Sequence, residues 1–78
     1  MTKQDKVVKI IADRASLRLA EISPGHSFQE LGVDDLTSME IVMSIEEEFN
    51  IKIPADDALK MTTVQAVIDL VYKYGDAS

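Results

Sequence analysis

Apolar residues recur every three or four positions near both ends of the chain. Near the amino end this stripe is made of Val7, Val8, Ile11 and Ala15, widened by Ile10. Near the carboxyl end it is made of Val64, Val67, Ile68 and Val71. Such spacing is typical of the buried face of an amphipathic helix, so it predicts helices over about 4–16 and 62–74.

Two more helices are predicted between these by their end signals. Asp34 or Asp35 can cap a helix that runs to Phe49 and ends at Asn50, and Pro54 suits the first turn of a short third helix. The last helix is expected to begin with a capping box between Thr62 and Gln65. Gly75 is expected to end it and to leave a frayed tail at 76–78.

Residues 19–33 contain Ser, Pro and Gly, which break the helical period. They are expected to form a loop that is long for a small bundle. Ile22, Phe28 and Leu31 are apolar enough to pin this loop onto the core.

The second helix carries more apolar residues than one buried stripe needs. One set, Ile41, Val42, Ile45 and Phe49, has the spacing of a core face. A second set, Leu36, Met39 and Met43, lies around the helix from it and is bordered by Asp35, Glu40 and Glu47. We interpret the second set as a docking surface, since methionine adapts to different partners. Alternatively, Met39 and Met43 fill gaps under the long loop.

With 78 residues the chain is expected to form a single domain, 1–78, and it contains no cysteine. The start lacks the apolar segment of a signal peptide, and no apolar run is long enough to span a membrane. A soluble cytoplasmic protein is therefore expected.

The net charge of −6 is concentrated in residues 33–57, which hold eight acidic residues and one lysine. Such a segment repels nucleic acid and anionic lipid and favours basic patches on other proteins. The alternative is an acidic, solvated helix face that only keeps the protein in solution.

Catalysis and metal binding find little support in the residues. The acids lie along one helix rather than in a pocket, and His26, the single histidine, is expected to be a surface loop residue. No calcium-binding loop motif is present, although weak divalent binding is conceivable at 46–48 or 56–57.

Several motifs occur together in the middle of the chain. Residues 31–36 read LGVDDL, 46–54 read EEEFNIKIP and 62–66 read TTVQA. In order and spacing these resemble the acyl carrier proteins of type II fatty acid synthesis, whose first motif is Leu-Gly-x-Asp-Ser-Leu. The resemblance extends over about 4–74.

The resemblance implies an all-α fold, an antiparallel up-down four-helix bundle with a short third helix, present as a monomer. It implies that acyl intermediates are carried on 4′-phosphopantetheine during fatty acid or related polyketide biosynthesis. It also implies that basic patches of the synthesis enzymes and of phosphopantetheinyl transferase read the second helix. The matching interaction positions are Asp34, Leu36, Met39, Glu40, Met43, Glu46 and Glu47.

One position departs from the pattern, because Asp35 stands where the family has the serine that holds the arm. A serine oxygen gives a stable phosphodiester, whereas a carboxylate would give an acyl phosphate that hydrolyses. Ser38, about 60° around the helix, is a poor substitute. The chain is therefore expected to stay unmodified and to act only by protein binding. Asp35 is then either a deliberate replacement or the mark of a natural non-carrying paralogue that serves as an interaction module.

Overall fold

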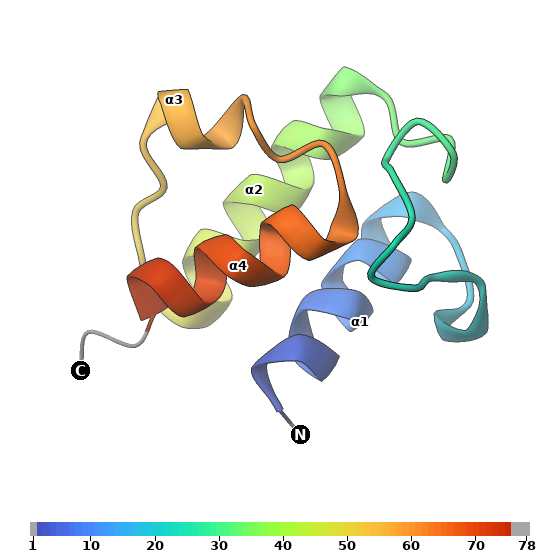
Figure 1. The fold of residues 1–78 in the computed structure, drawn as a ribbon, viewed down its shortest axis with the longest axis horizontal. Coiled ribbons are helices and arrows are strands. Elements are labelled where there is room, and N and C mark those ends of the chain that lie inside the picture. Colours follow the sequence, from blue (N-terminus) through green and yellow to red (C-terminus); the bar gives the residue numbers. More distant parts are fainter. Residues whose placement is uncertain (1, 76–78) are drawn as a thin grey trace.

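The computed structural model describes residues 2–75 and contains four α-helices there (Figure 1). They are α1 (Lys3–Ala15), α2 (Asp35–Phe49), α3 (Ala55–Ala58) and α4 (Val64–Gly75), with a 3-10 turn, η1 (Leu19–Glu21), after α1. Figure 1 shows α1 and α2 running in opposite directions, and α1 packs against both α2 and α4. The all-α, four-helix prediction is confirmed, while the tail predicted at 76–78 lies outside the described residues.

Both ends of α1 are closed by local hydrogen bonds. Thr2 and Asp5 form a capping box in which each side chain accepts a hydrogen bond from the other residue's backbone N–H. Ser16 ends the helix in the left-handed conformation. Between these two caps, Val7 and Ile11 of the predicted apolar stripe are fully buried.

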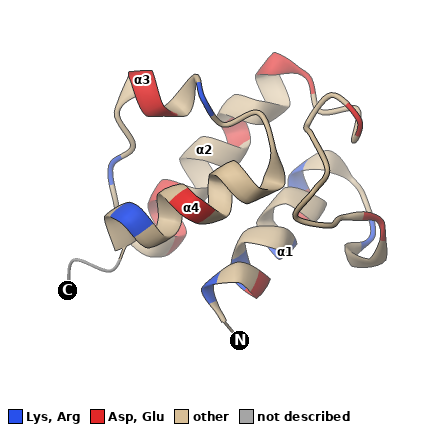
Figure 2. Cartoon of the chain, viewed as in Figure 1, with Lys and Arg blue, Asp and Glu red and all other residues tan. Residues whose placement is uncertain are grey.

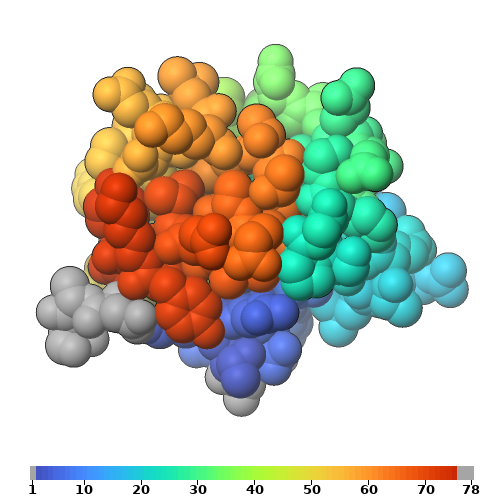
Figure 3. All heavy atoms as spheres, viewed as in Figure 1, coloured from blue at the N-terminus to red at the C-terminus, as the bar shows by residue number. Residues whose placement is uncertain are grey.

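The core lies where α1, α2 and α4 meet. Ile41 and Ile45 of α2 are fully buried, and the predicted face of α4 is buried throughout. Figure 3 shows α4 in the middle of one face, with α1, α3 and the long loop around it. Because each of the three long helices contributes fully buried side chains, none of them can leave without exposing the others.

The long loop is held by its side chains and by its backbone. Ile22 and Phe28 are buried, and Leu31 packs at the edge of the core, as predicted. The backbone N–H of Phe28 donates to the Thr62 carbonyl at 2.8 Å. Gly32, with φ of +74°, provides the left-handed turn that leads the chain into α2.

The start of α4 differs from the prediction. The hydroxyl of Thr63, not Thr62, accepts a hydrogen bond from a helix N–H, that of Ala66, at 3.0 Å. The Gln65 side chain donates to Asp69 at 2.8 Å instead of completing a capping box. The backbone N–H of Gln65 is already used by the carbonyl of Pro24. The predicted Thr62–Gln65 capping box is therefore wrong, because the docked loop occupies the position the box would need.

The α2–α3 connection begins at Asn50, which ends α2 in the left-handed conformation as predicted. A carboxylate oxygen of Glu46 then accepts the backbone N–H of Ile53 at 2.9 Å. Ile53 is itself buried, whereas Pro54 lies just before α3 as its cap residue rather than inside its first turn. The connection is thus fixed to α2 just before α3 begins.

Candidate functional site

Two adjacent carboxylates at the start of α2 have different surroundings. The backbone N–H of Thr37 donates to Asp34 Oδ1 at 2.8 Å, which makes Asp34 the capping residue. This hydrogen bond lowers the pKa of Asp34 below its ordinary value of 3.8. Asp35 is the first residue of the helix, and it is exposed. Of the two possible caps, the structure uses Asp34, which leaves the Asp35 carboxylate facing solvent.

The second apolar set of α2 lies on the surface. Leu36, Met39 and Met43 are 69%, 63% and 59% exposed. We call these three residues the α2 strip. Since Ile41 and Ile45 on the same helix are fully buried, α2 has two apolar faces, as predicted, and only one of them is used by the core. The alternative that Met39 and Met43 fill gaps under the loop is wrong.

A cleft of about 750 Å³ runs between α2 and α3, next to the α2 strip. Asp35, Ser38, Met39 and Val42 line it from α2. Ala58, Leu59 and Met61 line it from α3 and the turn that follows. Leu59 is 80% exposed and was not predicted as a site residue, because a four-residue helix is too short to show an apolar period. Residues 27–29 and 33 of the long loop also line it. The cleft therefore has apolar side chains on both the α2 and the α3 side, with the Asp35 carboxylate among its lining.

The acidic residues of α2 are not equivalent. Glu40 and Glu47 are exposed, whereas Glu46 is half-buried and bonded to the Ile53 N–H. Glu48 lies 3.9 Å from the Lys6 ammonium of α1. Figure 2 shows that acidic residues occur along α2 and α3 while α1 carries several of the basic ones. The charges that remain available beside the α2 strip are those of Asp35, Glu40 and Glu47.

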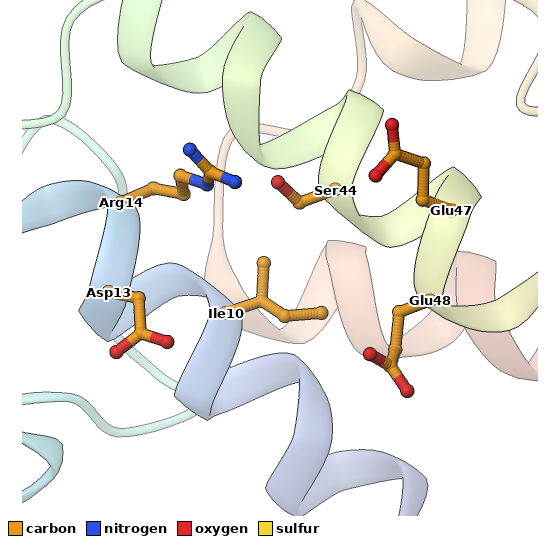
Figure 4. Close-up of a pocket in the computed structure, with 6 residues that line it drawn as sticks. All are labelled: Ile10, Asp13, Arg14, Ser44, Glu47 and Glu48. Carbon is orange, nitrogen blue, oxygen red and sulfur yellow. The ribbon is translucent and has the colours of Figure 1, made fainter.

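A second hollow, of about 490 Å³, lies between α1 and α2 (Figure 4). Ile10 lies between the two helices, and the Arg14 side chain extends toward Ser44, with Glu47 and Glu48 also on the α2 side. Asp13 also lines this hollow, so three carboxylates stand against the single guanidinium of Arg14 and the lining is net negative. The hollow therefore adds to the acidic character of α2 rather than forming a separate basic site.

Other kinds of site are not formed within residues 2–75. No three side chains among histidine, aspartate and glutamate are grouped so that they could hold a metal ion there. His26 is half-buried, and its Nδ1 accepts the backbone N–H of Ser23 at 3.2 Å, so it braces the loop. None of the helices in this part of the chain is long and apolar enough to cross a bilayer.

The fold and the site define a small helical carrier domain, and comparison with known proteins agrees. Residues 5–71 match the family model described as "Phosphopantetheine attachment site", and the chain belongs to this family. It is a carrier protein rather than an enzyme, and its family implies a phosphopantetheine prosthetic group.

The fold is also similar to that of a solved structure over most of both chains. The chain is similar to an acyl carrier protein from Thermotoga maritima, with 28% sequence identity and a TM-score of 0.78. The alignment covers 92% of this chain and 89% of that one. The acyl carrier fold inferred from the sequence motifs is therefore confirmed, and family and fold together support an acyl carrier role.

Proposed function

We propose that this chain is an acyl carrier-type protein of fatty acid or polyketide biosynthesis that acts, in the form given by its sequence, by docking rather than by carrying. The observation that carries the proposal is the exposure of the α2 strip, Leu36, Met39 and Met43. An apolar strip beside free carboxylates matches a partner surface with an apolar centre and a basic rim. The partners would be the synthesis enzymes and a phosphopantetheinyl transferase. The chain would act as one domain, 1–78, and as a monomer in the cytoplasm.

The residues of this docking surface would contribute to binding in different ways. The α2 strip would be buried against the partner, and Glu40 and Glu47 would pair with its lysines and arginines. Asp34 and Glu46 also belong to the predicted set, but their carboxylates already accept backbone N–H groups. They would act through the charge that they add to the rim.

The residues present do not fit the attached phosphopantetheine of the family. Asp35 presents a carboxylate at the exposed start of α2, and no hydroxyl is available at that position. Ser38 lines the neighbouring cleft but is half-buried. We infer that the chain stays without the arm and that Asp35 leaves a negative charge at the edge of the docking surface.

The attachment position can be tested by restoring a hydroxyl. Asp35→Ser, incubated with coenzyme A and a promiscuous phosphopantetheinyl transferase, is expected to gain the mass of one phosphopantetheine in intact-mass spectrometry. The unaltered chain is expected to gain none. Asp34→Ser is the matched control, because it introduces the same hydroxyl one residue earlier and keeps a capping oxygen. If Asp35→Ser stays unmodified while folded, the assignment of position 35 is wrong.

Docking can be tested separately by charge reversal. Glu40→Lys is expected to weaken binding to a basic ketosynthase by about tenfold at low salt, and the loss should shrink at high salt. Asp69→Lys, an equal charge reversal on the exposed side of α4, should change the Kd by less than about twofold. Equal losses for the two variants would mean that net charge, and not the α2 surface, governs binding. Comparing ketosynthases of fatty acid and polyketide synthesis would then identify the pathway.

A further inference from the structure

The outer wall of the α2–α3 cleft is formed by a short segment. Ala58, Leu59 and Met61 face Ser38, Met39 and Val42 of α2 across the cleft. Residues of the long loop also line the cleft, and the position of α3 sets the distance between the α2 side and the α3 side.

Apolar packing holds this segment mainly at its two ends, and along its length only Ala58 packs, partly buried, against the core. None of the four residues of α3 is buried. The buried side chains are Ile53 before the helix and Met61 after it. The Ile53 end is fixed further by the Glu46 carboxylate. Residues 54–60 thus form a strap between two anchors, and little burial opposes its outward movement.

A side-chain cluster connects the middle of the strap to the end of α4. The Tyr74 hydroxyl donates a hydrogen bond to Asp57 Oδ2, and the Lys73 ammonium lies 3.8 Å from the same oxygen. Within residues 2–75 this is the one side-chain hydrogen bond found between α3 and another helix. The bond lowers the pKa of Asp57 and raises that of Tyr74, as expected where a hydroxyl donates to an ionised carboxylate.

We propose that the Asp57–Tyr74 hydrogen bond is a latch that holds α3 against α4, and that its release lets the strap move away from α2 and opens the cleft to apolar ligands. When the latch is closed, α3 stays beside α4 and the cleft keeps the width seen here. When it opens, the anchors at Ile53 and Met61 remain in place, so the strap moves while the core of α1, α2 and α4 is retained. The role of the latch does not depend on whether residue 35 is modified.

Tyr74→Phe tests the latch, because it removes the hydroxyl and keeps the ring. The backbone N–H groups of Leu59, Lys60 and Met61 close the turns of the strap, and their hydrogen exchange reports its opening. Exchange at these three positions is expected to rise about fivefold, the effect of one hydrogen bond. Exchange at Ile11 and Val67 in the core should change by less than about twofold.

A binding measurement gives a second readout of the same equilibrium. The neutral fluorescent probe N-phenyl-1-naphthylamine is expected to bind in the open cleft. Because Tyr74→Phe raises the population of the open form about fivefold, the apparent Kd of the probe should fall by about the same factor. Tyr72→Phe is the matched control, because Tyr72 lies on the same helix turn, 44% exposed, with its ring near the Lys3 ammonium. It should alter neither readout.

Asp57→Asn keeps the proposal testable if Tyr74→Phe does not fold. The amide oxygen still accepts the tyrosine hydroxyl, but the bond loses its ionic character, so a rise in strap exchange of about twofold is expected. Unchanged strap exchange in the variants, or a rise of equal size in the strap and the core, would overturn the latch. No partner enzyme or prosthetic group enters either readout, so failure here is distinct from failure of the docking proposal.

Discussion

Asp34 and Asp35 are chemically identical neighbours that the start of α2 places in different roles. Asp34 lies outside the first turn, where its side chain reaches the Thr37 N–H. Asp35 lies inside the turn and faces solvent beside the cleft. A shift of one residue along the chain thus separates a structural carboxylate from one that is available to a partner.

The capping role of Asp34 leads to a pH-dependent prediction. Asp34→Ala is expected to lower the Tm by about 5 °C at neutral pH, because it removes the acceptor for the Thr37 N–H. Folding lowers the pKa of Asp34, so its contribution is complete above the ordinary value of 3.8 and is lost as the pH falls through the folded pKa. The Tm difference from the unaltered protein should therefore narrow as the pH falls below 3.8.

Asp35→Ala is the control for this experiment and should change the Tm little at any pH. A Tm difference for Asp34→Ala that stayed constant well below pH 3.8 would show that the cap does not depend on the ionised carboxylate.

At the scale of the element, local pattern predicted the helices well and their junctions less well. All four apolar residues predicted for α4 are buried, because a 3.6-residue period directly encodes a face. In α1 the buried small residue is Ala12, whereas Ala15, in the last turn, is only half-buried. The start of α4 was misassigned by one residue because loop residues 24–28 bond to its first turn, and such tertiary pairing leaves no local signal.

The two candidate caps of α4 can be distinguished by mutation. Thr63→Ala is expected to lower the free energy of unfolding by about 1 kcal/mol, because it removes the acceptor for the Ala66 N–H. Thr62→Ala removes an exposed side chain and should change it by less than about 0.5 kcal/mol. Urea unfolding of both variants measures the difference. The reverse order of stability would restore the predicted capping box.

At the scale of the whole molecule, the long loop belongs to the core. Phe28 is buried beneath the loop. Its backbone N–H donates to the Thr62 carbonyl, and the His26 carbonyl accepts the hydrogen bond of the Val64 N–H. The apolar residues of the loop predicted this docking, but its partners at the start of α4 are distant along the chain and could not be read from the sequence. The cleft also could be predicted only in part. The α2 strip was predicted from the pattern of one helix, whereas Leu59 lines the cleft because the tertiary fold places the end of α3 next to α2.

The loop anchor predicts a large loss of stability. Phe28→Ala is expected to lower the free energy of unfolding by about 3 kcal/mol, since a buried aromatic ring is replaced by a cavity. Leu19→Ala, in the exposed 3-10 turn of the same connection, should cost less than about 0.5 kcal/mol. Chemical unfolding measures both values. Similar small losses for the two variants would mean that the loop rests on the surface and contributes little to the core.

The distribution of charge between α1 and α2 affects how the molecule arrives at a partner. Bases gather on one helix and acids on the neighbouring one, so the protein has an electric dipole moment in addition to its net charge of −6. The field of a cationic surface exerts a torque on this dipole and turns the acidic side toward that surface before any atoms touch. A protein with the same net charge spread evenly would meet its partner in random orientations, so fewer encounters would lead to binding and the association rate constant would be lower.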